Sequence, residues 1–193
     1  MTGTSRLLFS GLLFPTLLSV ALPAGPSRVI DPEKSVLTVR VFKTGMLSAF
    51  GHEHEIRAPI EQGSFSTDPP EVELRVDARN LRVLDKAISD NDRAEIQQTM
   101  LGPKVLDSQR FPEIRFQAAG PATQQGGQWR LHGQLTVRGQ TRPVEVVVQE
   151  KNGHYVGAST FKQRDFGITP DSGAGGTVKT KDELRAEFDV VGK

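Results

Sequence analysis

Strict alternation between apolar and polar residues is the feature of this chain that most restricts its fold. The pattern is clearest in residues 72–78 (VELRVDA), 129–139 (WRLHGQLTVRG) and 183–190 (ELRAEFDV). Successive side chains of a β-strand point to opposite faces of the sheet, so each stretch predicts a strand with one apolar and one polar face. Strands of this kind pair in antiparallel sheets that cover a core with one face and expose the other to water.

The rest of the chain continues the same pattern. Four more stretches are typical of strands: SVLTVRVF at 35–42, PEIRFQAA at 112–119, PVEVVVQE at 143–150 and YVGASTFKQ at 155–163. Clusters of glycine and proline separate them, among them DPPE at 68–71 and KNG at 151–153. Many short strands with regular turns predict an all-β antiparallel domain, either a barrel or a sandwich.

One segment, residues 89–107, departs from the two-residue period. Asp90 or Asn91 can cap a helix there, and Ile96 and Met100 lie one helical turn apart. The pair Gly102-Pro103 ends it, because proline cannot continue a helix. We therefore expect one short helix in an otherwise all-β domain.

The N-terminus has the layout of a secretory signal peptide. Arg6 precedes an uncharged run from Leu7 to Leu22, and small residues at its end offer cleavage sites. A membrane anchor is the alternative, but the run is short for a span and Pro15 interrupts it. We predict that residues 1–24 are cleaved, that residues 25–193 form one domain, and that the mature protein is soluble and periplasmic.

Composition excludes several classes of function. The chain has no cysteine, which rules out disulfides and thiol chemistry. Loss of the predicted signal peptide removes one arginine and leaves 23 basic against 23 acidic residues. A balanced charge gives no basic surface for nucleic acid. The common hydrolase, zinc-protease and phosphate-loop motifs are missing, so we expect a protein without catalytic residues or a cofactor.

The stretch GHEHE at 51–55 is the most chemical feature of the sequence. On a strand, His52 and His54 would point to the same face, where two imidazoles could bind one metal ion. Glu53 and Glu55 would point to the opposite face. The remaining histidines are His132, predicted on an outer face, and His154. A closed site lacks an obvious third ligand, so the alternative is a polar strand near the end of a barrel.

Taken together and in order, several segments resemble the YceI-like family. The resemblance is carried by IDPEKSVLTVRV, NDRAEIQQTMLGPKVLDSQRFPEIRFQ, LHGQLTVRGQTRPVEVVV, RDFGI and DELRAEFDV, which span most of residues 29–191. It implies an eight-stranded antiparallel lipocalin-like β-barrel with the helix near its mouth. It also implies an exported bacterial protein whose barrel holds a polyisoprenoid or another long-chain lipid.

The resemblance and the alternation together define candidate ligand-binding residues. The large side chains expected to line the barrel are Leu74, Val76, Phe116, Leu135, Val137, Val146 and Phe188. Small residues expected on the same inner surface are Ala118, Gly133, Ala158 and Ala186. If His52 and His54 also face inward, their rings could hydrogen-bond the polar end of the ligand.

Two other functions stay open at this point. One is a periplasmic metal-binding protein, or a metal-dependent hydrolase, that uses His52 and His54. The other is a non-enzymatic interaction module with a solid barrel, in which the small inner residues interlock with the large ones and leave no space.

Overall fold

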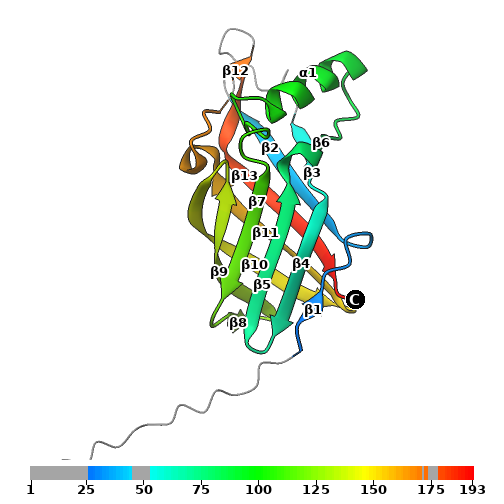
Figure 1. Ribbon diagram of the computed structural model, residues 1–193, viewed down its shortest axis with the longest axis vertical. Coiled ribbons are helices and arrows are strands. Elements are labelled where there is room, and N and C mark those ends of the chain that lie inside the picture. The colour runs from blue at the N-terminus through cyan, green and yellow to red at the C-terminus, as the bar shows by residue number, and fades with distance from the viewer. Residues whose placement is uncertain (1–25, 45–52, 171, 174–177) are drawn as a thin grey trace, which may run out of the picture.

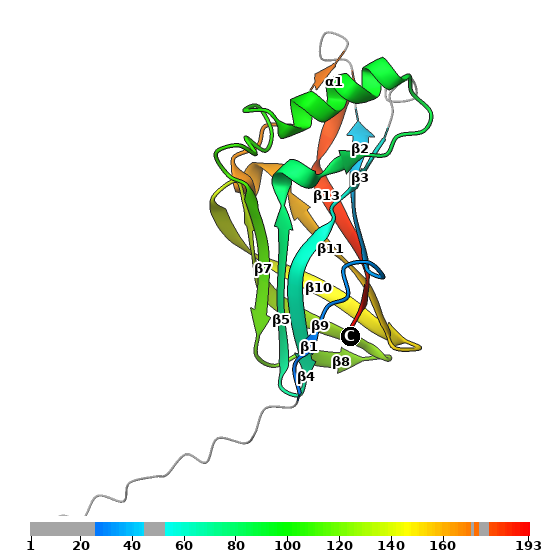
Figure 2. The same cartoon turned by 45° about the vertical axis from the view of Figure 1, so that its right-hand side comes forward.

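The computed structural model describes residues 26–44, 53–170, 172–173 and 178–193. Within them one antiparallel sheet curls around a long axis (Figures 1 and 2). Its thirteen strands are β1 (Arg28–Val29), β2 (Val36–Thr44), β3 (His54–Arg57), β4 (Ile60–Thr67), β5 (Pro70–Asp77), β6 (Arg82–Val83), β7 (Glu113–Ala119), β8 (Thr123–Gln125), β9 (Gln128–Val137), β10 (Gln140–Lys151), β11 (His154–Lys162), β12 (Ser172–Gly173) and β13 (Val178–Val191). The helical elements are η2 (Ala78–Asn80), α1 (Asp90–Leu101) and η3 (Gln163–Phe166).

The strands follow the order β1-β4-β5-β7-β9-β10-β11-β13-β2-β3-β6, and all the pairings are antiparallel. The prediction of an all-β antiparallel domain with one short α-helix is confirmed. The number of strands differs from the eight that were predicted. Eight of the thirteen strands have seven or more residues, and the other five are short strands that pair with them. The predicted signal peptide, residues 1–24, lies outside the described residues and stays a prediction.

The sheet closes through a chain segment that bends at Ala58 and Pro59. Before the bend, β3 pairs with β2, with Ile56 opposite Val39. After it, β4 pairs with β5 at the other side of the strand order. The Ala58 amide donates to the carbonyl oxygen of Leu37 at 2.9 Å. Because β3 and β4 are nearly continuous, the two sides of the sheet meet and form a barrel.

Helix α1 lies across one end of the barrel, called here the upper end (Figure 2). The hydroxyl of Ser89 accepts the amide hydrogen of Asp92 at 3.1 Å, so Ser89 is the N-cap. The prediction of Asp90 or Asn91 at this position was wrong by one or two residues. Gly102 ends the helix as predicted, and Met100 is buried. Among the described residues, no helix is long and apolar enough to cross a membrane.

Apolar side chains fill the barrel at its two ends. The upper cluster brings Met100 of α1 together with Val137 of β9 and Phe166 of η3. The lower cluster contains Ile30, Ile60, Phe65 and Val190. Between the clusters, inward-facing side chains such as Leu74 and Phe188 are only partly buried. The interior is therefore dense at both ends and looser in the middle.

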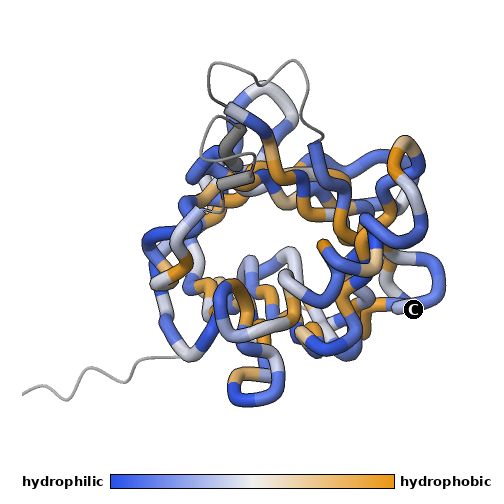
Figure 3. Tube along the Cα trace, turned by 90° about the horizontal axis from the view of Figure 1, so that it is seen from above, coloured by the Kyte–Doolittle hydropathy of each residue, from blue (hydrophilic) through white to orange (hydrophobic). Residues whose placement is uncertain are grey.

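Charged residues such as Arg40, Glu187 and Arg130 form ion pairs on the outer face of the sheet. Hydrophilic and hydrophobic residues alternate along the strands (Figure 3). Arg40 donates to Glu187 at 2.7 Å and to Glu55 at 3.2 Å. The hydrogen bond from Arg40 lowers the pKa of the Glu187 carboxyl below its usual range, so this group stays ionised. Arg164 pairs with Asp182, across to β13, and not with Asp165 beside it. These pairs keep charge on the water-facing side of the barrel wall.

Arg138, in the turn between β9 and β10, bonds to two other loops at the upper end. Its guanidinium donates to the carbonyl of Pro103 after α1 at 2.9 Å, and to that of Gly167 after η3 at 2.7 Å. We predict that Arg138→Ala lowers the free energy of unfolding by about 1–2 kcal/mol, because both carbonyls lose a charged donor. Urea denaturation measures the change. Arg142→Ala is the control: its bonds stay within the β9–β10 hairpin, and it should have an effect below about 0.5 kcal/mol. Equal losses would contradict the bridging role.

Candidate ligand cavity

The middle of the barrel holds a cavity of about 310 Å³. Its wall extends from Thr67 and Pro70 at the lower β4–β5 hairpin to Met100 and Leu106 near the upper end. Along β9 alone the lining reaches from Trp129 to Val137, about 27 Å at about 3.4 Å per residue. This volume lies at the lower end of the roughly 300–1,000 Å³ range of small-molecule sites, and the shape is elongated.

The wall of the cavity is apolar. Among the described residues that line it there is no lysine, arginine, aspartate or glutamate. The polar groups of the wall belong mainly to Ser66, Thr67, Ser159 and Gln163. Ser159 donates to the Glu145 carbonyl at 2.7 Å, and Gln163 donates to the Lys181 carbonyl at 2.8 Å. A charged ligand group placed here would lose water without gaining a counter-charge.

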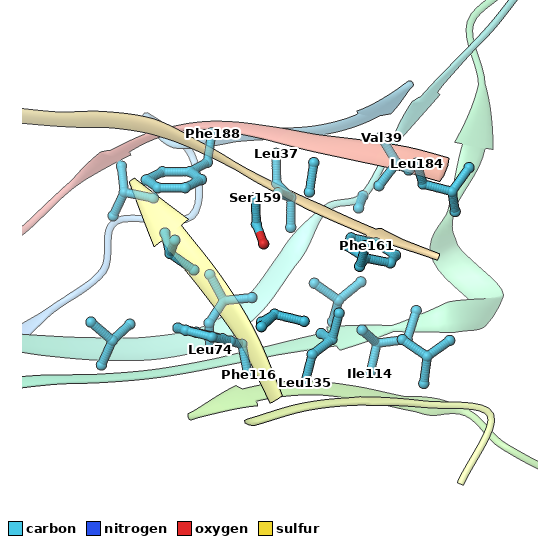
Figure 4. Close-up of a pocket in the computed structure, with 18 of the residues that line it drawn as sticks. Leu37, Val39, Leu74, Ile114, Phe116, Leu135, Ser159, Phe161, Leu184 and Phe188 are labelled. Carbon is cyan, nitrogen blue, oxygen red and sulfur yellow. The ribbon is translucent and has the colours of Figure 1, made fainter. Parts of the chain in front are cut away.

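All seven large side chains expected to line the barrel do line this cavity: Leu74, Val76, Phe116, Leu135, Val137, Val146 and Phe188. In Figure 4, Leu74, Phe116 and Leu135 face Phe188 and Leu37 across the space. The strands β5, β7, β9, β10 and β13 bring them together from five parts of the sequence. Their placement follows the alternation, and their role in binding a ligand stays a prediction.

The small residues are placed less uniformly. Ala186 lines the cavity, and Ala118 and Gly133 are buried on the inner surface. The prediction that Ala158 lies on this surface was wrong. Its neighbours Gly157 and Ser159 are on the inner face of β11, as are Tyr155 and Phe161, so Ala158 is on the outer face. The segment YVGASTFK has small or apolar residues at both parities, so its alternation does not define a face.

Two glycines are covered directly by aromatic rings. A Cβ atom at Gly133 would lie 2.5 Å from two atoms of the Phe116 ring, and one at Gly157 would lie 2.6 Å from Cζ of Phe188. Phe188 is the cross-strand partner of Gly157. The ends of these rings therefore lie over glycines of neighbouring strands. This packing accommodates large side chains on the wall and still leaves a space.

Several lining residues were missed from the sequence. The only tryptophan, Trp129, and the only tyrosine, Tyr155, both line the cavity toward its lower end. Tyr155 packs on Phe65 with ring centroids 4.6 Å apart, and the Arg28 guanidinium lies 5.5 Å from the Phe65 centroid. Alternation placed Trp129 on the apolar face of its strand, so this signal was available. Tyr155 and Phe65 lie in stretches without a clear period.

His54 lies on the same face of β3 as Ile56, but it is not itself among the residues that line the cavity. It is opposite Val41 and two residues from Ile56, and both of these line the cavity. Its Nδ1 atom is 2.6 Å from Oδ2 of Asp85, a carboxyl whose side chain is only 4% exposed. The Glu55 amide donates to the other oxygen of Asp85 at 2.8 Å. Asp85 follows β6, so two separate strands set the orientation of the imidazole.

The other histidines do not join His54. His52 lies outside the described residues, and its predicted role is left open. His132 is exposed on the outer face, as expected, and His154 bonds Asp189 at 2.7 Å on the surface. Within the described part of the chain, no group of three or more histidine and carboxylate side chains could hold a metal ion. The predicted His52–His54 metal site therefore gains no third ligand there.

Comparison with known proteins agrees with this architecture. Residues 29–192 match the YceI-like domain. UPF0312 proteins of Shewanella baltica and Shewanella oneidensis are 26% and 25% identical to the chain, over 86% of its length and 89% of theirs. The crystal structure of Burkholderia cenocepacia BcnA has a similar fold, with a TM-score of 0.67 and 19% identity over 85% of this chain and 99% of BcnA. The chain therefore belongs to the YceI-like family.

Proposed function

We propose that this protein is an exported carrier that holds a long apolar chain, a polyisoprenoid or a similar lipid, inside its barrel. The observation that carries the proposal is the elongated cavity, whose wall has no charged side chain in the part of the chain that the structure describes. The protein acts by binding: it shields an apolar molecule from water and breaks no bond.

The energetics favour such a ligand. Apolar side chains in the middle of the barrel are partly exposed to the cavity, so a bound chain removes their surface from water as well as its own. Each methylene buried in this way contributes about 0.8 kcal/mol. A chain of several isoprene units would therefore bind well without any ionic contact. The packing of Phe116 and Phe188 over glycines of neighbouring strands is compatible with a chain lying along the axis.

The N-terminal sequence supports a place of action outside the cytoplasm. An uncharged run after Arg6 with small residues at its end supports export through a signal peptide. A soluble carrier in the periplasm would move a lipid between membranes that the free lipid cannot leave.

Native mass spectrometry of the untagged protein, purified from a bacterial periplasm, tests the proposal. We expect a mass above that of the mature chain, and we expect organic extraction to remove the excess. The extracted molecule is then identified by its fragmentation. Excess mass that a chelator removes would favour metal binding through His52 and His54 instead. A protein that is always bare, and that takes up no added polyprenol, would contradict the carrier function and favour the interaction module.

A further inference from the structure

The turn between β10 and β11 contains the one asparagine of this chain that is followed by glycine, Asn152. The other two asparagines are followed by larger residues, and both lie in helical elements, Asn80 in η2 and Asn91 in α1. Asn152 and Gly153 are instead exposed at the tip of a hairpin. Asn152 therefore differs from the other asparagines both in its neighbour and in its place in the fold.

Asn152 and Gly153 form a two-residue turn with a left-handed backbone. The angle φ is 54° at Asn152 and 82° at Gly153, which matches the twist of a hairpin. Lys151 and His154 are the last pair of the two strands. Beyond that pair the Gly153 amide is directed to a side chain, since it donates to Oε1 of Glu150 at 2.8 Å. A carboxylate therefore already accepts the hydrogen of this amide.

An asparagine followed by glycine can lose its side-chain nitrogen without an enzyme. The main-chain nitrogen of Gly153 gives up its proton and forms a bond to Cγ of Asn152. The bond from Cγ to the side-chain nitrogen breaks, and ammonia leaves with that proton. Water then opens the cyclic imide at one of its two carbonyls and gives aspartate or isoaspartate. Glycine favours the ring closure because it has no Cβ and adopts the required backbone angles freely.

We propose that Asn152 is a site of spontaneous deamidation, and that the Glu150 carboxylate promotes it by accepting the proton of the Gly153 amide. The tip of a hairpin opens locally at low cost, so the turn can rearrange until the two reacting atoms meet. Glu150 stays in place because it belongs to β10 and pairs with Tyr155 of β11. The inference goes beyond the carrier function and does not depend on it, since the reaction needs only the folded chain and water.

Conversion of Asn152 would alter the lower end of the barrel. Isoaspartate adds a methylene group to the main chain, and the turn then departs from the geometry that suits the two strands. The new carboxylate also places negative charge near Glu150. Val148 and Tyr155, close to the turn on β10 and β11, line the cavity. Deamidation would therefore age the protein at one end of its cavity.

Other charged and titratable groups surround the turn, and they come from β10, β11, β13 and β1. They are Lys151, His154, Tyr155, Asp189 and Arg28. Among them His154 is the one other base, but its Nδ1 atom is bonded to Asp189 at 2.7 Å. In the described part of the chain, the bond that the Gly153 amide donates goes to Glu150. The geometry therefore favours the carboxylate over the imidazole as the proton acceptor.

Incubation of the mature protein, followed by tryptic digestion and mass spectrometry, measures the conversion. Trypsin cleaves after Lys151 and Lys162, so Asn152 lies in one short peptide. We expect the mass of this peptide to rise by the exchange of an NH₂ group for OH, and we expect two products that chromatography separates, aspartate and isoaspartate. The peptides that contain Asn80 and Asn91 are internal controls and should stay unchanged. A sample taken at zero time gives the background of the digestion.

Glu150→Gln tests the role of the carboxylate, because its amide oxygen still accepts the Gly153 hydrogen bond but cannot take the proton. Glutamate is ionised at pH 7.5 and at pH 8.5, so the unaltered protein should convert at rates that differ by less than about twofold. In Glu150→Gln hydroxide must remove the proton, and the rate should rise about tenfold over the same interval. At pH 7.5 the variant should be about tenfold slower than the unaltered protein. His154→Gln is the control and should keep the flat profile.

The outcomes are distinct. If Asn152 converts no faster than Asn80 and Asn91, the deamidation site is wrong. Equal rates and equal pH dependence in the unaltered protein and in Glu150→Gln would overturn the role of the carboxylate. A steep profile in His154→Gln, with a flat one in Glu150→Gln, would assign that role to the imidazole instead.

Discussion

Gly157→Val is expected to lower the free energy of unfolding by about 3–5 kcal/mol. A Cβ atom at this position would overlap the carbonyl oxygen of Val147 and would lie 2.6 Å from the Phe188 ring. The carbonyl belongs to the paired strand β10, so the clash cannot be relieved by a side-chain rotation. Strands β10 and β11 would have to separate.

Thermal unfolding measures this effect, and we expect a fall in Tm of about 10 °C or more. Ala158→Val is the matched control, because Ala158, the residue after Gly157 in β11, lies on the outer face of the strand. A valine there should change Tm by no more than a few degrees. If the two variants were equally stable, the close approach of β10 and β11 at Gly157 would be wrong.

Ala186→Phe is expected to weaken binding of a polyprenol by about 100-fold, while leaving the fold intact. Ala186 lines the cavity from β13 and lies opposite Val39 and Ser159 on its neighbouring strands. A phenyl ring there takes the place of several ligand carbons, each worth about 0.8 kcal/mol. Because the ring fills empty space, thermal stability should stay the same or rise slightly.

Trp129 emission and thermal unfolding, measured on the same samples, check both halves of this prediction. Ala119→Phe makes the same exchange on the exposed face of β7 and should leave binding unchanged. A strongly destabilised Ala186→Phe would show that the barrel is already full, as the interaction module requires. Unchanged binding would place the ligand elsewhere.

The clear alternation of β5, β9 and β13 was enough to predict which of their side chains face inward. In ELRAEFDV every second residue is charged, so burying the wrong face would bury four charges and only one register is possible. Leu74, Leu135 and Phe188 were placed correctly for this reason. The inner face of β11 could not be predicted, because Ala158 and Ser159 are equally compatible with either face.

Other features depend on residues that are distant in sequence. Asp85 lies 31 residues from His54, and only the pairing of β3 with β6 brings the two together. The cavity itself is a difference between the volume of the barrel and the volume of its side chains. It depends on the Phe116 and Phe188 rings lying over glycines of other strands. No local pattern carries either kind of information.

The first and last strands lie close enough for the order of the strands along the chain to be changed by circular permutation. Ile30 bridges to Gly192, and the Lys193 amide donates to the Val29 carbonyl at 2.8 Å, so both ends of the domain meet at the lower end of the barrel. A short linker could join them, and the β8–β9 turn at Gly126-Gly127 could supply new ends. In that circular permutant β13 is followed along the chain by β1 and then by its pairing partner β2, and the pairing of β7 with β9 becomes long-range. We expect the same barrel to form, with the β7–β9 pairing, which is now long-range, as the last to close.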